Sequence, residues 1–285
     1  MSATGAGVKT GTVISADAAE QLRRLQAVLL QHGTLALAVS GGVDSMTLAV
    51  VACALDSDTQ VFHALSPAVP ASGTERVRHY AAQYKWQLNC VNAGELDDPD
   101  YRANPGNRCY YCKTNLYQSL HKHTTLTLAA GTNLDDLQDY RPGLVAASEQ
   151  QVVHPLVEAG ISKQGVRQIA SLLNLHDLFE LPASPCLSSR ITTGIAIDAE
   201  LLPLIDNTEQ ALRKLLQLQG TQDLRCRILS HRIAIQTDCA PDAELQMHIR
   251  QTVTEVFRAT RFSHYCRQIS IEPYRKGSAF IHVAT

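Results

Sequence analysis

LALAVSGGVDSMTLAV, residues 35–50, is the stretch that decides the fold. It opens with a short apolar run typical of a buried strand (35–40) and leads into an apolar run, 46–55, that is long enough for a buried helix. The two glycines between these runs allow a sharp turn and let backbone N–H groups approach a ligand. We therefore predict a strand, a glycine-rich turn and a helix whose N-terminal dipole attracts an anion.

Strand and helix patterns continue to alternate up to about residue 175. This alternation indicates a parallel sheet with helices on both faces, so we predict an α/β, doubly wound fold. Ser72 and Glu75 have the spacing of a capping box before one predicted helix, and Ser162 is expected to cap another. The further strands are predicted at 60–65, 87–93 and 125–131, with 152–156 as a candidate fifth, and the helices at 16–33, 76–85, 110–123 and 162–175.

The pattern changes near residue 195. Beyond this point the sequence predicts one long helix and then three strands with a further helix among them, which is typical of a small α+β domain. We therefore divide the chain into a flexible tail (1–15), a doubly wound ligand-binding domain (16–195) and a substrate or oligomerisation domain (196–285). The long helix is predicted at 198–220 and the strands at 224–229, 231–238 and 265–273.

Composition narrows the class of function. The 285 residues carry a formal net charge of −2, which argues against a nucleic acid as the main partner. No apolar run approaches the roughly 18 residues of a membrane-spanning helix, and residues 1–15 lack the apolar core of a secretory signal. We expect a cytoplasmic protein with no membrane partner. In that reducing compartment the eight cysteines are expected to be thiols, ligands or nucleophiles.

The turn SGGVDS (40–45) has neither the Walker spacing nor the G-x-G-x-x-G pattern. It resembles the pyrophosphate loop, or PP-loop, of the adenine nucleotide α-hydrolase-like ATP pyrophosphatases. The resemblance implies that ATP lays its β- and γ-phosphates on the loop and that Asp44 helps to place Mg²⁺. A substrate oxygen would then attack the α-phosphate, giving an adenylate and pyrophosphate. A strand–helix turn without a ligand is the alternative. The residues assigned to ATP are Ser40, Gly41, Gly42, Val43 and Ser45.

The segment GTNLDD (131–136) directly follows the strand predicted at 125–131, so it is expected at the same edge of the sheet as the turn. Gly131 and Asn133 suit the ribose or adenine side of the nucleotide. Asp135 and Asp136 either hold a metal ion or cap the next helix.

Three cysteines have the pattern of a metal centre. Cys109 and Cys112 form a C-x-x-C pair, and Cys186 stands in a distant segment. Structural zinc usually takes four protein ligands, whereas three thiolates leave one iron of a [4Fe–4S] cluster open to a non-protein ligand. We favour the cluster, with structural zinc, a redox pair and inert thiols as the alternatives.

Two arginines of the second domain suit an anion. Arg225 and Arg227 alternate along a predicted strand, which puts both guanidinium groups on one face, an arrangement that fits a phosphate. A solvated strand face is the alternative.

Several motifs together resemble one family within the pyrophosphatase group, the LarE family of ATP-dependent sulfur transferases that mature the lactate racemase cofactor. The resemblance covers roughly residues 17–280. It implies that ATP adenylates a carboxylate of pyridinium-3,5-biscarboxylic acid mononucleotide and that a sulfur nucleophile then displaces AMP, leaving a thiocarboxylate. The motifs are SGGVDS, NPGNRCYYCK (104–113), GTNLDDLQDYRPGLVAASE (131–149), HPLVEAGISK (154–163), SPCLSSRI (184–191) and EPYRKGS (272–278).

The family has two branches. One sacrifices the sulfur of a single cysteine in the position of Cys186, and the other uses three cysteines to hold a [4Fe–4S] cluster that carries the transferred sulfide. The set Cys109, Cys112 and Cys186 indicates the cluster branch, with sulfide or another sulfur donor resupplied and with Cys186 and Asp44 in catalysis. We also expect a homo-oligomer. The residues that the resemblance assigns to the substrate are Arg190, Arg225, Arg227 and Glu209.

The sequence departs from the family at HDLFELPASP (176–185), where a W-x-K-P type stretch is usual, so the loop that presents Cys186 is expected to differ. The segment YRKGS (274–278) resembles a family signature, but we assign it no role. Three rival classes are a cluster-dependent tRNA thiolation enzyme, an amide-forming synthetase and a non-enzymatic ATP-binding redox sensor.

Overall fold

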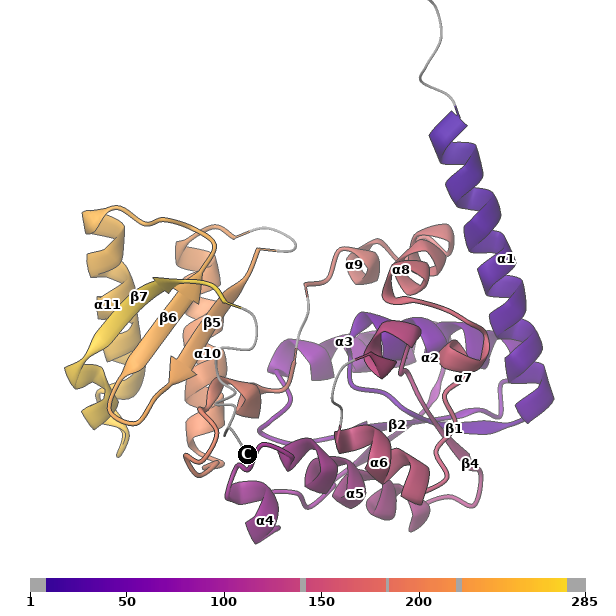
Figure 1. Ribbon diagram of the computed structural model, residues 1–285, viewed down its shortest axis with the longest axis horizontal. Helices are drawn as coiled ribbons and strands as arrows, with labels where there is room; N and C mark the ends of the chain where they lie inside the picture. Colours follow the sequence, from indigo (N-terminus) through magenta and orange to yellow (C-terminus); the bar gives the residue numbers. More distant parts are fainter. Residues whose placement is uncertain (1–8, 139–141, 183–184, 219–221, 276–285) are drawn as a thin grey trace, which may run out of the picture. The chain divides into compact units, whose positions relative to one another are not determined.

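Figure 1 shows the computed structural model of the chain, which describes residues 9–138, 142–182, 185–218 and 222–275, with side chains from residue 16 onward. The described residues belong to two compact units. The first unit takes them from Met1–Ala64, Ser72–Val91 and Tyr117–Leu181, and the second unit from Leu65–Ala71, Asn92–Leu116 and Pro182–Thr285.

The first unit is built on a parallel sheet of four strands in the order β3-β2-β1-β4. In the central strand, Ala36 pairs with Gln60 of β2 on one side and with Leu128 of β4 on the other. The parallel sheet and its flanking helices confirm the predicted α/β class. The strands are β1 (Leu35–Ala38), β2 (Gln60–Ala64), β3 (Gln87–Val91) and β4 (Thr127–Ala130).

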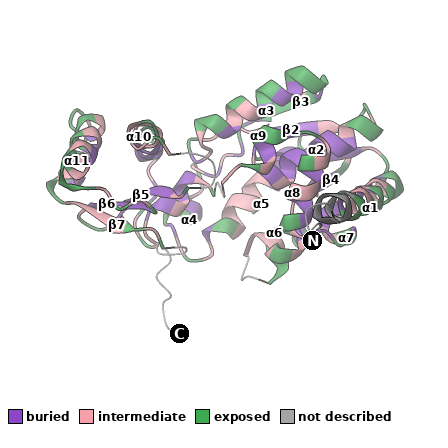
Figure 2. Cartoon of the chain, turned by 90° about the horizontal axis from the view of Figure 1, so that it is seen from above, coloured by how far each residue is buried: buried purple, intermediate pink, exposed green. Residues whose placement is uncertain are grey.

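Helices cover both faces of this sheet. Helix α2 (Val43–Leu55) lies between the sheet and helices α1 (Lys9–His32) and α8 (Lys163–Leu172), which explains why its sequence is apolar almost throughout (Figure 2). Helix α6 (Pro142–Glu149) lies on the opposite face (Figure 1). The remaining helices of the region are α3 (Ala71–Tyr84), α5 (Arg108–His121), α7 (Pro155–Glu158), α9 (His176–Phe179) and the 3-10 turn η1 (Leu134–Leu137).

Helix α1 begins at Lys9, within the segment 1–15 that is predicted as a tail, and that division stays a prediction. Two local predictions were wrong. Helix α3 begins at Ala71, directly after Pro70, so Ser72 lies inside the first turn and cannot be the capping residue. The candidate strand at 152–156 is reduced to one bridge, between Val153 and Ala129, because Pro155 has no N–H to donate and starts α7 instead.

The second unit contains a three-stranded sheet in the order β5-β6-β7. Strands β5 (Leu224–Ile228) and β6 (Ile233–Thr237) are antiparallel, and β7 (Ile269–Pro273) is parallel to β6. Apolar side chains of these strands form one core with helices α10 (Leu201–Leu215) and α11 (Ala243–Phe257). The unit also contains α4 (Pro99–Arg102), η2 (Leu187–Arg190) and η3 (Ser263–Arg267), and its small sheet agrees with the predicted α+β region.

The two compact units are not separated at residues 195 and 196. That position, as a boundary between functional domains, stays a prediction. The second unit takes in residues 92–116, between β3 and β4, and therefore contains the C-x-x-C pair. None of the described helices has the length and apolar character of a membrane span.

Candidate functional site

The glycine turn lies between β1 and α2, at the carboxyl edge of the parallel sheet, where ligands bind in this class of fold. Gly41 has a φ of +85°, and a Cβ placed there would lie 2.5 Å from the carbonyl oxygen of Gly73. Gly42 is the N-cap of α2, with φ −81°. Only glycine therefore fits at position 41. The first N–H groups of α2 have no acceptor within the helix, and helix starts of this kind attract anions.

Two serines brace this turn. The hydroxyl of Ser45 donates to the carbonyl oxygen of Gly42 at 3.2 Å and accepts from the N–H of Ser40 at 3.2 Å. The two hydroxyl oxygens lie 3.2 Å apart. Ser40 is exposed, whereas Ser45 is buried. Ser45 thus holds the shape of the turn, and Ser40 remains accessible to a ligand.

Residues of β2 and α3 support the turn from behind. Nη1 of Arg76 donates to the carbonyl oxygen of Gly41 at 2.6 Å. The buried His63 donates from Nδ1 to the carbonyl oxygen of Val39 at 2.8 Å, so its Nε2 accepts from the hydroxyl of Thr74 at 2.9 Å. Burial lowers the pKa of His63, and the Arg78 guanidinium lowers it further. A neutral imidazole and a guanidinium therefore fix the carbonyl groups of the turn.

The segment after β4 packs directly against the start of α2. A Cβ at Gly131 would lie 2.7 Å from the backbone nitrogen of Ser45, so position 131 requires glycine. Asn133 donates from Nδ2 to Oδ1 of Asp44 at 3.2 Å, and its own Oδ1 caps η1. Asp136 completes the capping box of η1. The structure thus brings Gly131 and Asn133 to the turn, as the nucleotide-site prediction requires.

Asp44 is half-buried beside this cap. Desolvation raises the pKa of its carboxyl group, the cations Lys163 and Arg167 lower it, and Asp136 raises it. Oδ2 of Asp135 accepts from the backbone N–H of Lys163 at 2.5 Å, so Asp135 fixes the start of α8. No role was predicted for Lys163, which ends the motif HPLVEAGISK, or for Arg167. Their signal is the spacing of two cations by four residues at a helix start.

All three predicted cluster ligands belong to the second unit. Cys109 and Cys112 lie three residues apart on the first turns of α5, and Cys186 immediately precedes η2. Burial raises the pKa of Cys112 to about 12; the Lys113 ammonium lowers it, and Cys186, Glu95 and Cys109 each raise it further. Cys109 and Cys186 therefore both lie near Cys112.

Within the described parts of the chain, no group of three or more His, Cys, Asp or Glu side chains converges as a metal site. The donor set, three thiols in one compact unit, is of the type that iron–sulfur clusters take. The neighbouring Tyr101 and Ser188 share a hydrogen bond of 2.7 Å between their hydroxyl groups. Burial raises the pKa of Tyr101, and Cys186 and Cys112 add to this effect.

Arg190 and Glu209 form a buried ion pair beside Cys186. Nε and Nη2 of Arg190 donate to the two carboxylate oxygens of Glu209, each at 2.9 Å. Nη1 donates to the carbonyl oxygens of Pro185 at 2.7 Å and Cys186 at 3.2 Å. Burial alone would lower the pKa of Arg190, but Glu209 outweighs it and the pKa is raised. The pair therefore fixes the loop that carries Cys186, and all three guanidinium nitrogens of Arg190 have partners within the chain.

Arg225 and Arg227 share one face of β5, as predicted, but they have different partners. Arg225 forms an ion pair of 2.9 Å with Asp223 and lies over the ring of Tyr274. Arg227 lines a pocket of about 320 Å³, which also includes Arg275 of the YRKGS segment. Residues 276–278 of that segment lie outside the described residues. The pocket is lined by Thr192, Arg227, Leu229, Gln236, Glu272, Pro273 and Arg275.

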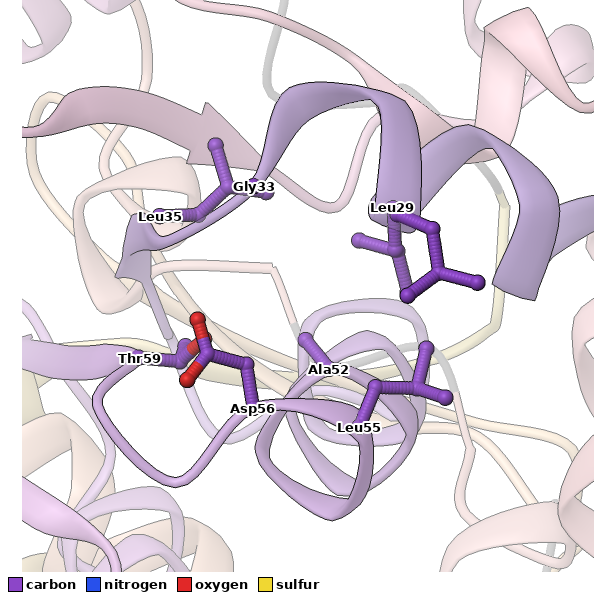
Figure 3. A pocket seen from close by; sticks show the side chains of 8 residues that line it. Leu29, Gly33, Leu35, Ala52, Leu55, Asp56 and Thr59 are labelled. Carbon is purple, nitrogen blue, oxygen red and sulfur yellow. The ribbon is translucent and has the colours of Figure 1, made fainter.

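Figure 3 shows the side chains that line a second pocket, of about 260 Å³. Leu35, the first residue of β1, and Asp56, the residue that ends α2, both line it, together with apolar side chains such as Leu29 and Leu55. Its place at the amino edge of β1 separates it from the predicted nucleotide site.

A four-stranded parallel sheet with a glycine turn at its carboxyl edge, together with a small C-terminal sheet, defines an α/β protein with a PP-loop-like domain. No family model matches the chain. The chain belongs to the same family as the uncharacterized protein slr1717 of Synechocystis sp., to which it is 41% identical over 189 residues, covering 63% of this chain and 68% of the relative.

Two more distant relatives extend this comparison. The uncharacterized protein MJ0830 of Methanocaldococcus jannaschii is 26% identical over 243 residues, or 84% of this chain and 90% of the relative. Pyridinium-3,5-bisthiocarboxylic acid mononucleotide synthase of Lactiplantibacillus plantarum is 27% identical over 198 residues, or 67% of this chain and 71% of the relative. The last likeness supports a relationship to the LarE family and does not distinguish its branches.

Proposed function

We propose that the protein is an ATP-dependent sulfurtransferase that converts a carboxylate of pyridinium-3,5-biscarboxylic acid mononucleotide into a thiocarboxylate. The observation that carries the proposal is the glycine turn at the carboxyl edge of the sheet, which Arg76 and His63 support. The chain is also related to a synthase whose name states a bisthiocarboxylic acid mononucleotide as its product.

The first unit would perform the adenylation. A carboxylate oxygen of the substrate attacks the α-phosphorus of ATP, the bond to the β-phosphate breaks, and pyrophosphate leaves with its negative charge. N–H groups at the start of α2 stabilise that charge, and the Lys163 and Arg167 cations near Asp44 add to the effect. The half-buried carboxylate of Asp44 would hold a Mg²⁺ ion, which would supply positive charge for the leaving pyrophosphate.

Activation of the acid is needed because a carboxylate is a poor acyl donor. In the acyl adenylate, AMP is a good leaving group, so a sulfur nucleophile can attack the carboxyl carbon. The carbon–sulfur bond forms as the bond to AMP breaks.

The second unit would supply the sulfur. We propose that Cys109, Cys112 and Cys186 hold a [4Fe–4S] cluster, which would present sulfide at an iron without a protein ligand. The residues of the chain then have supporting roles. Arg190 and Glu209 hold the Cys186 loop, and the pair of hydroxyls of Tyr101 and Ser188 lies beside the thiols. Sulfide or another sulfur donor would restore the cluster after each transfer.

The same unit would bind the substrate phosphate. Arg225 and Arg227 share one strand face, and the pocket that Arg227 lines carries a second arginine, Arg275. Guanidinium groups bind phosphate oxygens through charge-assisted hydrogen bonds. A homo-oligomer and a cytoplasmic location stay predictions.

The test is anaerobic purification followed by iron and acid-labile sulfide analysis, together with pyrophosphate release on addition of the pyridinium substrate and ATP. About four irons per chain and substrate-dependent pyrophosphate release are expected. About one zinc per chain would overturn the cluster. Salt-dependent tRNA binding would favour a tRNA thiolation enzyme, and the absence of pyrophosphate release with any carboxylate would favour a redox sensor.

A further inference from the structure

The three arginines assigned to the substrate phosphate differ in the charge of their partners. Both carboxylate oxygens of Glu209 pair with Arg190, and the carboxylate of Asp223 pairs with Arg225. For Arg227, no carboxylate lies within ion-pair distance in the described part of the chain. Arg227 is therefore the arginine of the three whose positive charge is not already matched by an acidic partner.

A neutral side chain holds Arg227 instead. Its Nε donates to Oε1 of Gln236 at 2.6 Å, and its Nη1 donates to the carbonyl oxygen of Ser189 at 3.0 Å. Arg227 and Gln236 are only 6% and 5% exposed. Both line the 320 Å³ pocket, so the orientation of the guanidinium is fixed at the pocket wall.

A carboxylate on the neighbouring strand β7 fixes the side-chain amide of Gln236. Gln236 pairs in register with Glu272 of β7, and the Glu272 carboxylate accepts a hydrogen bond from the Gln236 side chain. Arg232 donates to the same carboxylate at 2.7 Å, and so does the hydroxyl of Ser270 at 2.7 Å. Burial raises the pKa of Glu272, but these hydrogen bonds outweigh it and the pKa is lowered. With its nitrogen turned to Glu272, Gln236 can present only its oxygen to Arg227.

A neutral partner matters because an anionic one competes with the ligand. A carboxylate at position 236 would pair with Arg227 as Glu209 pairs with Arg190, and a phosphate would have to displace it. An amide oxygen orients the guanidinium and leaves its net charge unmatched. Desolvation lowers the pKa of Arg227; Arg190 and Arg225 lower it further, and Tyr274 and Glu209 oppose them. An anion bound at the guanidinium would offset the desolvation of its charge.

We propose that Gln236 is a positioning and specificity residue, which orients Arg227 at the pocket without neutralising it, so that the pocket selects a phosphate monoester over neutral ligands. Arg275 lines the same pocket and supplies further donors. The identity of the monoester, a pyridinium mononucleotide, rests on the proposed function, whereas the preference for a phosphate monoester rests on the geometry.

The test compares Gln236→Glu with Gln236→Met and the unchanged protein, using ribose 5-phosphate and ribose as probes in calorimetric titration. We expect Gln236→Glu to raise the Kd of ribose 5-phosphate about tenfold or more, because the new carboxylate neutralises Arg227, and Gln236→Met to raise it less. Ribose binding and the KM of ATP should not change. The thermal stability of each variant is measured alongside, because a carboxylate at position 236 gains Arg227 as an ionic partner but loses the amide donor to Glu272 and faces the Glu272 carboxylate.

Gln251→Glu is the matched control, because it adds the same charge at an exposed position of α11 and residue 251 does not line the pocket. Ribose 5-phosphate binding by Gln236→Glu within about twofold of the unchanged protein would overturn the inference. A Kd raised only in proportion to lost stability would also overturn it. Substrate-dependent pyrophosphate release tests the proposed function alone. If no pyrophosphate is released but Gln236→Glu still weakens ribose 5-phosphate binding, the proposed function is overturned and the inference about Gln236 stands.

Discussion

The glycines around the turn are required for different physical reasons. Gly41 needs a left-handed backbone conformation and has Gly73 against it, and Gly131 is pressed against the backbone of Ser45. Gly42 has ordinary extended backbone angles, and a Cβ there would have Ser40 Oγ as its nearest neighbour, at 3.5 Å. Side chains at 41 and 131 would therefore disturb the fold, whereas one at 42 would enter the space beside the anion site.

Gly42→Val is thus expected to fold and to block adenylation. The valine methyl groups would occupy the space in front of the N–H groups of α2, where the phosphates of ATP are proposed to bind. We expect loss of pyrophosphate release with unchanged iron absorbance, measured on the same anaerobic preparation. Gly41→Val serves as the contrast, because it should fail to fold or lose several degrees of thermal stability. Normal pyrophosphate release by Gly42→Val would refute the assignment of the turn to ATP.

His63 makes the first unit sensitive to acid. Its pKa in the folded protein is lowered by burial, below the value of about 6.5 expected in the unfolded chain, so the unfolded chain binds the proton more readily. The free energy of unfolding is therefore at its full value above about pH 6.5 and falls as the pH drops below it, by at most about 1.4 kcal/mol per pH unit for this one group.

His63→Asn should flatten that dependence. Asparagine keeps a donor for the carbonyl of Val39 and cannot titrate. Urea unfolding between pH 5 and pH 8 measures the slope in both proteins. An equal slope in His63→Asn would show that a different group binds the proton.

At the scale of elements, periodicity predicted the strands well and the supporting contacts not at all. Strands β1, β2 and β4 and helix α2 appear as largely apolar runs because they are mostly buried. The edge strand β3 is mostly exposed. The sequence predicts Arg76 only as part of a helix, because no neighbouring residue distinguishes an arginine that donates to the carbonyl of Gly41 from one exposed to solvent. The partners of Gln236 and Lys163 likewise come from other elements, so no spacing within the chain encodes them.

Helix α3 is expected to act as the brace of the nucleotide site through Arg76. Arg76→Met keeps the length of the side chain and removes the hydrogen bond to Gly41, so the carbonyl of the turn is no longer held away from the N–H groups of α2. We expect kcat/KM for pyrophosphate release to fall roughly 10- to 100-fold, the range for one hydrogen bond from a charged donor. Arg78→Met, an exposed cation on the same helix, is the matched control and should change it less than about threefold.

At the scale of the whole molecule, the chain leaves the first unit after β3 and returns to it at Tyr117. The intervening residues 92–116 carry Cys109 and Cys112 into the unit that also holds Cys186. A linear division of the sequence assigns all three cysteines to the ATP-binding domain, and the contacts place them in the other unit. The assignment of residues 92–116 to the second unit depends on which segments pack together. The spacing of hydrophobic residues along the sequence does not contain that information.

This division predicts that the two half-reactions can be lost one at a time. The residues proposed for adenylation, such as Gly42 and Asp44, lie in the first unit, and the proposed cluster ligands lie in the second. Cys112→Ser should therefore lose most of its iron and form no thiocarboxylate, yet still release pyrophosphate on addition of ATP and the pyridinium substrate. Cys90→Ser, which changes an exposed cysteine on β3, should retain iron and both reactions. Because adenylation needs no sulfur, loss of pyrophosphate release in Cys112→Ser with a native melting profile would mean that the cysteines serve the ATP chemistry itself, and the assignment of separate tasks to the two units would fail.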